Sequence, residues 1–326
     1  MEKKTALITG GAGFIGSHLA DYCLEQGLEV TVIDDLSHST IKNLDGFKVN
    51  FVKADIRDLS SVEAEFEKAD YIFHLAGLAD IVPSIENAPL YHDVNVNGTV
   101  NILELVKKYG CEKFVYAASS SCYGIPNNYP TDESEIINPM YPYALTKKLG
   151  EDYVLHYSKV YGFEAISLRL FNAYGTRSRT NGTYGAVFGT FLAQKLAGKP
   201  FTVVGDGTQK RDFIYATDVA RAFYLASQSK LNGEVINIGA GKPQSVNKLV
   251  ELLGGEKVYI PKRPGEPEQT FANIKKAKEL LNWSPEISFE EGVSIILDNI
   301  DYWKDAPVWT KETIEKATSS WFKHLS

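Results

Sequence analysis

The sequence is poor in the features that mark secreted, membrane-spanning and metal-binding proteins. It has only three cysteines, Cys23, Cys111 and Cys122, which are scattered and form no C-x-x-C pair, so we expect neither a disulfide framework nor a metal site. Nowhere do about 18 apolar residues run without interruption, as a membrane span requires, and the N-terminal stretch lacks the apolar core of a signal peptide. We therefore expect a soluble cytoplasmic protein with no membrane partner.

Basic residues are also in the minority. The chain of 326 residues holds 34 Lys and Arg against 41 Asp and Glu, a net charge of −7, and no run of Lys or Arg interrupts this acidity. Nucleic acid is therefore not expected as a partner. The 44% of hydrophobic residues is typical of a globular protein with a large core, and the length predicts one large domain with a smaller one beside it.

The first half of the chain alternates short apolar runs with stretches of helical spacing. The spacing predicts helices over 14–26, 95–109 and 143–160, and strands over 5–9, 30–34, 49–55, 71–76, 113–119 and 164–170. Strand-then-helix repetition indicates parallel strands joined by crossover helices. We therefore expect an α/β fold with a doubly wound parallel sheet of the Rossmann type.

After Leu170 the pattern changes, which predicts a smaller, interleaved α/β substrate domain. A loop rich in Gly, Ser, Thr and Arg (172–185) precedes a helical stretch at 186–197, strands around 201–204 and 234–238, a Pro- and Gly-rich loop at 261–267 and helical spacing at 274–282 and 289–302. We assign residues 1–171 plus about 213–238 to a dinucleotide-binding domain, and residues 172–212 plus 239–326 to the substrate domain.

A glycine-rich segment, GGAGFIG at residues 10–16, follows the first expected strand and opens the first expected helix. Glycines there allow a tight turn and let backbone N–H groups approach a pyrophosphate at the positive end of the helix dipole. A tight turn that binds nothing is the alternative. We expect contacts to a dinucleotide from Gly10, Gly13, Phe14, Ile15 and Gly16.

The acid that completes this motif is Asp34, at the end of the second expected strand. It is placed to accept hydrogen bonds from an adenosine ribose, and Asp35 follows it, while no arginine occurs before Arg57. A 2′-phosphate would therefore meet negative charge, so we predict NAD rather than NADP. The alternative is a pair of helix-capping aspartates.

Two further motifs supply reactive groups. Tyr143 and Lys147 form a Y-x-x-x-K at the start of an expected helix, which brings phenol and ammonium onto one helical face. An ammonium and an oxidised nicotinamide both favour the phenolate, so Tyr143 could act as the acid/base for a hydroxyl that loses hydride. Ser119 ends the strand at 113–119, where a hydroxyl could bond the reacting oxygen; a normal serine turn is the alternative.

In this order and spacing, these motifs resemble those of the extended short-chain dehydrogenases/reductases that act on nucleotide sugars. The resemblance implies that Asp55 and Ile56 flank the adenine, that Leu75, Ala76 and Gly77 line the cofactor, and that Lys147 also holds the nicotinamide ribose. It implies further that Ser119 and Tyr143 face the sugar hydroxyl, and that the substrate is bound by Ser120, Ser121, Asn172, Arg211 and Arg263. The arginines would grip a nucleotide diphosphate, although either could instead form a surface ion pair.

One departure from the family separates the possible reactions. Members that act as 4,6-dehydratases have an acidic pair where this chain has Ser120 and Ser121, and serine cannot transfer protons as a carboxyl group can. The motif is more similar to that of 4-epimerases, so we predict NAD-dependent oxidation at C4 of a nucleotide-linked sugar, followed by return of the hydride to the other face.

Other outcomes stay open at this point. Release of the keto sugar would make the protein a 4-dehydrogenase, and similar enzymes act on GDP-heptoses in bacterial surface-polysaccharide biosynthesis. Dehydration and a non-catalytic dinucleotide-binding role are further alternatives. The loop at 176–184, with Arg177 and Arg179, does not decide between a UDP and a GDP sugar. Family resemblance also implies a homodimer formed by helices at about 86–109 and 141–160.

Overall fold

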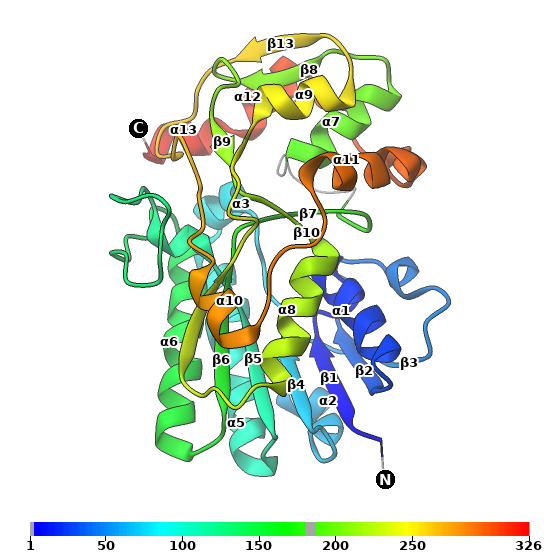
Figure 1. Ribbon diagram of the computed structural model, residues 1–326, viewed down its shortest axis with the longest axis vertical. Coiled ribbons are helices and arrows are strands. Elements are labelled where there is room, and N and C mark those ends of the chain that lie inside the picture. The colour runs from blue at the N-terminus through cyan, green and yellow to red at the C-terminus, as the bar shows by residue number, and fades with distance from the viewer. Residues whose placement is uncertain (1–2, 180–186, 326) are drawn as a thin grey trace.

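The largest element of the protein is a sheet of seven parallel strands, in the order β11-β6-β5-β4-β1-β2-β3. The computed structural model describes residues 3–179 and 187–325 and is shown in Figure 1. The strands are β1 (Thr5–Thr9), β2 (Glu29–Asp34), β3 (Val49–Lys53), β4 (Tyr71–His74), β5 (Lys113–Ser119), β6 (Ala165–Leu170) and β11 (Glu234–Ile238). Chain order runs outwards from β1 in both directions, which confirms the predicted doubly wound fold.

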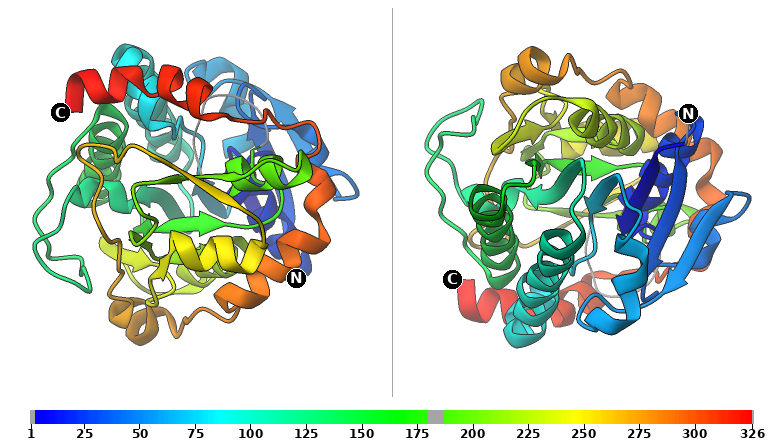
Figure 2. Two further views of the ribbon diagram at one scale, coloured as in Figure 1. Left: turned by 90° about the horizontal axis from the view of Figure 1, so that it is seen from above. Right: turned by 90° about the horizontal axis from the view of Figure 1, so that it is seen from below.

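Helices cover both faces of this sheet (Figure 2). On one face α1 (Phe14–Glu25) packs against α8 (Ala216–Gln228), and their apolar side chains join the larger of the two core clusters that flank this sheet. On the other face α5 (Gly98–Tyr109) and α6 (Pro142–Tyr161) pack side by side over the second cluster. Because both faces are covered, most residues of the strands between them are apolar, as in β4 and β5.

The chain leaves the sheet after β6, returns to its edge in β11, and then leaves it again. Strands from before and after β11 pair with one another in three small sheets. The small sheets pair β7 (Asn172–Tyr174) with β10 (Phe213–Tyr215), β8 (Phe201–Val204) with β13 (Lys257–Ile260), and β9 (Lys210–Arg211) with β12 (Gln244–Ser245). Around them lie α7 (Val187–Leu196), α9 (Val246–Leu253), α11 (Phe289–Asp298), α12 (Lys311–Ala317) and α13 (Ser319–Leu325), whereas α10 (Lys275–Leu281) packs against β11 and α8. An aromatic-rich core cluster joins α7, α9 and α11.

Three expected elements differ in detail. The loop expected at 172–185 begins with the strand β7, and its residues 180–185 lie outside the described ranges. The helix expected at 95–109 starts as a π-helical turn over Asp93–Asn97; the Asn95 side chain there bonds to Leu78 and Thr146 instead of lying on the helix surface. The helix expected at 289–302 ends at Asp298, and a 3-10 turn follows at Ile300–Trp303.

Within residues 3–179 and 187–325, no helix is both long and apolar enough to cross a membrane. The same ranges contain no cluster of three or more His, Cys, Asp or Glu side chains arranged to hold a metal ion. Cys23, Cys111 and Cys122 are free thiols.

Candidate active site

The glycine-rich segment makes the tight turn between β1 and α1. Gly10 has a φ of +72°, and a Cβ atom on it would lie 2.6 Å from the backbone nitrogen of Ala76. A Cβ atom on Gly16 would lie 2.2 Å from the carbonyl oxygen of Gly10, so only glycine lets the helix approach the loop this closely. Among the described residues, no side chain caps α1 and none in its first turn is acidic. Its first amide groups and positive dipole therefore suit an anion.

The Asp34 carboxylate lies beside this turn and accepts three hydrogen bonds from the chain itself. The donors are the backbone N–H of Ala12 at 3.0 Å, the backbone N–H of Leu36 at 2.9 Å and the Ser39 hydroxyl at 2.6 Å. Burial raises the pKa of Asp34, and these bonds oppose the rise. A carboxylate has about four acceptor positions, so three bonds do not exhaust its capacity for a ribose hydroxyl.

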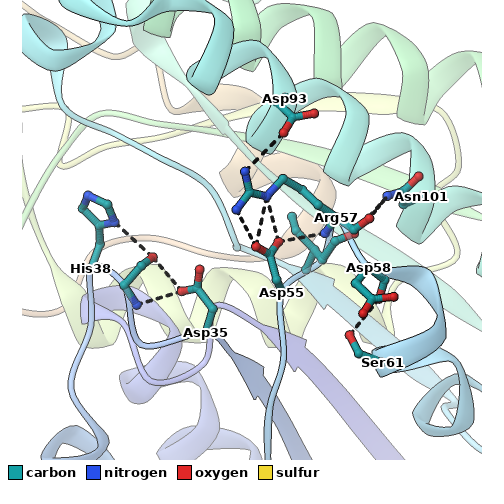
Figure 3. Close-up of polar contacts among 10 residues, drawn as sticks. Asp35, His38, Asp55, Arg57, Asp58, Ser61, Asp93 and Asn101 are labelled. Atoms are coloured by element: carbon teal, nitrogen blue, oxygen red, sulfur yellow. Dashed lines mark hydrogen bonds and ion pairs between the residues drawn. The ribbon is translucent and has the colours of Figure 1, made fainter.

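Arg57 lies between two carboxylates near the end of β3 (Figure 3). Its guanidinium donates to both oxygens of Asp55, at 3.0 and 2.6 Å, and to Asp93 at 3.2 Å. The bonds from Arg57 lower the pKa of Asp55 and fix its orientation, while the neighbouring Ile56 is buried against Gly98. With its charge engaged by two acids, Arg57 is poorly placed to bind a 2′-phosphate, which favours NAD.

The segment that follows β4 brings the residues expected to line the cofactor close to Lys147. The backbone N–H groups of Leu75 and Ala76 donate to the carbonyl and hydroxyl oxygens of Thr9, at 3.0 and 3.3 Å. A Cβ atom on Gly77 would lie 3.8 Å from the Nζ atom of Lys147. The segment therefore passes between the glycine turn and the lysine, as expected of a cofactor wall.

Ser119, Tyr143 and Lys147 gather at the carboxyl end of β5. Ser119 is the last residue of that strand, and Tyr143 and Lys147 lie in the first two turns of α6. Burial raises the pKa of Tyr143, and a hydrogen bond to the Ser119 side chain opposes this rise. Burial also lowers the pKa of Lys147 to about 7, against the attraction of Glu151. The phenol of Tyr143, the alcohol of Ser119 and the amine of Lys147 thus lie in one partly desolvated region. Proton transfer between these groups and a bound hydroxyl is possible there.

A buried polar network beneath Lys147 escaped the sequence analysis. Glu151, which is 1% exposed, accepts hydrogen bonds from Nε and Nη2 of Arg169 at 3.0 and 2.6 Å and from Ser167 at 2.9 Å. The Lys147 ammonium also lies over the ring of Tyr116. The spacing of four residues between Lys147 and Glu151 could have suggested one helical face, but Arg169 and Ser167 come from β6, and no local pattern connects them to α6.

The serine turn after β5 is compact. The hydroxyl oxygens of Ser119 and Ser121 are 2.8 Å apart, and the backbone N–H of Ser121 donates to Ser119. Ser120 and Ser121 are half-buried in a 3-10 turn.

Burial raises the pKa of the Cys122 thiol to about 12, so this cysteine is a packing residue and not a nucleophile.

Asn172, Arg211 and Arg263 come from separate segments and meet around Glu266 and Thr270. The Glu266 carboxylate lies 3.3 Å from Nη1 of Arg263 and 3.8 Å from Nη2 of Arg211. The Thr270 hydroxyl donates to the side-chain oxygen of Asn172 at 2.6 Å. The shared carboxylate brings two guanidinium groups to one place, and a pair of such groups suits a diphosphate.

Arg177 and Arg179, in the loop that follows β7, form ion pairs with different parts of the protein. Arg177 pairs with Asp21 on α1 at 2.9 Å and donates to the carbonyl of Ser17, so it ties the loop to the sheet-bound part of the protein. Arg179 pairs with Asp80 at 2.8 Å, and the negative charge of Asp80 in turn raises the pKa of Tyr143. Asp80 is therefore a further residue near the candidate base that the sequence analysis did not identify. Residues 180–184 of this loop lie outside the described ranges.

Comparison with known proteins gives a consistent result. The model of the NAD dependent epimerase/dehydratase family matches residues 6–239. A putative UDP-glucose 4-epimerase of Methanocaldococcus jannaschii is 40% identical over 300 residues, and the match covers 90% of this chain and 97% of that protein.

Two solved structures are also similar over nearly their whole length. A UDP-glucose 4-epimerase from Thermotoga maritima, determined with UDP-glucose, is 35% identical with a TM-score of 0.86; the match covers 92% of this chain and 99% of the other. A UDP-glucuronic acid 4-epimerase from Bacillus cereus, in complex with UDP-glucuronic acid and NAD, is 33% identical with a TM-score of 0.83; the match covers 91% and 99%.

Proposed function

Because this chain belongs to the NAD dependent epimerase/dehydratase family and uses NAD as its cofactor, we propose that it is a 4-epimerase of a UDP-linked sugar that acts through a 4-keto intermediate. It is an enzyme of the extended short-chain dehydrogenase/reductase type, as its motifs indicate. The observation that carries the proposal is the placement of Tyr143 beside Ser119, whose side chain opposes the burial-driven rise in the pKa of Tyr143, one helical turn from the buried Lys147.

The residues around the glycine turn fit NAD. Gly10 and Gly16 leave no room for a side chain, the N-terminus of α1 offers amide groups to a pyrophosphate, and Asp34 can accept a bond from a ribose hydroxyl. Further contacts would come from the rest of the predicted set, which comprises Gly13, Phe14, Ile15, Asp55, Ile56, Leu75, Ala76, Gly77, Tyr143 and Lys147. NAD, when bound, supplies the acceptor for the C4 hydride and the donor that returns it.

The chain's own residues would handle the proton. Tyr143 takes the proton of the C4 hydroxyl, and the nearby ammonium of Lys147 favours the phenolate that does so. Ser119 hydrogen-bonds the same oxygen and holds it towards Tyr143. Once the keto sugar has turned over in the site, Tyr143 returns the proton and the inverted alcohol forms.

The substrate would be bound by residues on the side of the site opposite the glycine turn. Asn172, Arg211 and Arg263 surround the place expected for the diphosphate, and Ser120 and Ser121 would contact the sugar. The division into residues 1–171 plus 213–238 and 172–212 plus 239–326 belongs to the same proposal, since each part would supply one wall. Uridine is supported by the three matched proteins named above, which are by their names UDP-sugar 4-epimerases.

The reaction can be tested directly. The purified protein is incubated with UDP-glucose, UDP-galactose, UDP-glucuronic acid, UDP-N-acetylglucosamine and a matched set of GDP sugars, and the products are identified by NMR and mass spectrometry. We expect inversion at C4 of one UDP sugar with no net change in NAD. Accumulation of a keto sugar with reduced cofactor would instead identify a 4-dehydrogenase, loss of one water would identify a dehydratase, and binding without turnover would contradict catalysis.

We also propose that the protein is a homodimer. Leu145, Tyr153 and Val160 are 48%, 41% and 54% exposed and recur along one side of α6, and an apolar stripe of this kind marks an interface. The paired surface would comprise residues of about 86–109 and 141–160. Sedimentation at micromolar concentration tests this: a 36.1 kDa species as the sole component would refute it. Cytoplasmic location and a role in surface-polysaccharide synthesis stay predictions.

A further inference from the structure

The C-terminal helix α13 (Ser319–Leu325) lies beside the candidate site. Figure 2 shows the C-terminal helices running along one side of the protein next to the segment that contains α3 (Ile81–Glu86). α13 packs against α3, and the Ser320 hydroxyl donates to the Glu86 carboxylate at 2.8 Å. The helix therefore connects the cofactor side of the site with the loop that carries Arg263. It lies beyond residue 239, where the family match ends.

Trp321 is the residue of α13 that faces inwards. It is 3% exposed, and its indole N–H donates to the carbonyl oxygen of Pro264 at 2.7 Å. The guanidinium carbon of Arg263 lies 5.4 Å from the centre of the tryptophan ring, within the range of a cation–π interaction. One side chain thus holds both the backbone and the charged group of the expected diphosphate loop.

The same ring also reaches the reactive side of the site. The Trp321 and Tyr141 rings are 6.3 Å apart, and Tyr141 is in turn stacked on Tyr143, with centroids 6.3 Å apart and 8° between the planes. Trp321 is therefore the common neighbour of Arg263 and of the aromatic pair that contains the expected base.

We propose that Trp321 is a positioning residue for the nucleotide sugar: it holds Arg263 ready for the diphosphate and steadies Tyr141 against Tyr143. This inference rests on the proposed function for the roles of Arg263 and Tyr143. An arginine that is already oriented by an aromatic face loses less side-chain entropy when it binds phosphate. The indole N–H contributes separately, because it fixes the position of the loop backbone.

Binding of UDP tests the proposal without requiring turnover. Calorimetry gives the Kd for UDP of the full-length protein and of the variants Trp321→Ala, Trp321→Phe and Lys323→Ala. Lys323 is exposed on the same helix and serves as the matched control. We expect Trp321→Ala to raise the Kd roughly tenfold, Trp321→Phe to raise it about threefold because the ring remains over Arg263, and Lys323→Ala to leave it unchanged.

Kinetics on the epimerised sugar separate positioning from simple helix packing. If Trp321 positions the substrate, Trp321→Ala raises KM with a much smaller change in kcat. If it only supports the fold, kcat falls with the fraction of active protein while KM and the Kd for UDP stay at their wild-type values, and the inference is overturned. Should the alanine variant not fold, Trp321→Phe decides the question: an unchanged Kd for UDP in that variant overturns the inference.

A double-mutant cycle with Arg263→Ala identifies the route of the effect. When Arg263 is absent, most of the loss caused by removing Trp321 should disappear, because the two residues act as a pair. Fully additive effects would contradict the proposed route.

The role of Trp321 and the 4-epimerase assignment can fail independently. Weaker UDP binding in Trp321→Ala, with no sugar turned over by the wild type, would contradict only the 4-epimerase assignment. Epimerisation by the wild type together with unchanged UDP binding in Trp321→Ala would contradict only the role of Trp321. A wild-type protein that binds neither UDP nor GDP would contradict both proposals.

Discussion

The Nζ atom of Lys147 lies 4.4 Å from the centre of the Tyr116 ring, and Glu151 lies one turn further along α6. Burial lowers the pKa of this lysine to about 7, while Glu151 acts against the fall, and the ring face contributes about 0.5–2 kcal/mol in favour of the ammonium. The protonation of Lys147 is therefore balanced close to neutral pH by burial and by two buried neighbours, Tyr116 and Glu151.

Replacing Glu151 by glutamine should move the pH dependence of the reaction. The variant loses the negative charge that supports the ammonium, and the guanidinium of Arg169 is left unneutralised beside it, so the pKa of Lys147 falls further. Because the protonated lysine exists below its pKa, the alkaline limb of kcat against pH should shift to lower pH. Asp152→Asn removes an exposed carboxylate from the same helix and should leave the profile in place. Superimposable profiles for wild type and Glu151→Gln would refute this role.

Tyr143→Phe should abolish most of the activity while sparing the cofactor. Loss of the acid/base group is expected to reduce kcat by about 10²–10⁴-fold, whereas the glycine turn that should hold NAD is untouched. The NAD content after denaturation and the rate on the epimerised sugar are measured together. Tyr259→Phe, which changes a tyrosine that is 53% exposed on β13, should behave like the wild type. Near-normal turnover in Tyr143→Phe would rule out this tyrosine as the base.

Gly16→Ala should damage both stability and cofactor binding. The added methyl group would meet the backbone of Gly10 and Gly11 at 2.2 and 2.7 Å, and backbone cannot move aside as a flexible side chain can. We expect a loss of about 1–3 kcal/mol in the free energy of unfolding and little bound NAD. In the control Gly189→Ala, the one described atom within 4 Å of the methyl group is the Arg179 carbonyl oxygen, at an ordinary 3.6 Å, so the helix α7 should be slightly stabilised. A Gly16→Ala protein with full NAD content would contradict the close approach.

Asp212 should make the stability of the protein depend on pH. Burial raises the pKa of its carboxyl from 3.8 to about 6, although the backbone N–H groups of Ala240, Gly241 and Ala272 donate to it. Between these two pH values the folded chain binds more protons than the unfolded chain, so this group's contribution to stability is complete below pH 3.8 and is lost as the pH rises through 6.

The variant Asp212→Asn isolates that contribution. It should show a flatter dependence of unfolding free energy on pH between 4 and 7 than the wild type, measured by urea denaturation at several pH values. It should also be less stable at pH 7 by about 1–3 kcal/mol, because an amide N–H2 would face backbone donors. Asp301→Asn, at an exposed position, is the control. Parallel curves for wild type and Asp212→Asn would disprove the assignment.

The sequence predicted those features whose signals are local. The apolar runs at β1, β2, β4 and β5 alternate with helical spacing, and the glycine segment lies where one strand meets one helix, so fold class and cofactor type follow from short stretches of chain. Tyr143, Lys147 and Ser119 are predicted as site residues for the same reason, since each belongs to a short motif. The match to the family confirms the resemblance inferred from them.

The features that local patterns missed depend on contacts between distant segments. Asp80 meets Arg179 across 99 positions, and Trp321 meets Tyr141 from the other end of the chain. No spacing rule predicts such pairs, since they arise only when the fold brings the segments together. Asn95 illustrates the reverse case, because its tertiary bonds to Leu78 and Thr146 override the regular helix that its sequence pattern predicts.

The edge position of β11 has a consequence for folding during synthesis of the chain. β6 has β5 on one side and β11 on the other, and 63 residues separate Leu170 from Glu234. While the chain is being synthesised, the outer edge of β6 stays open until Ile238 has left the ribosome, and an open edge readily pairs with other chains. A fragment that stops at Phe171 should therefore aggregate, and slow translation between these strands would prolong the exposure of nascent chains to the same hazard.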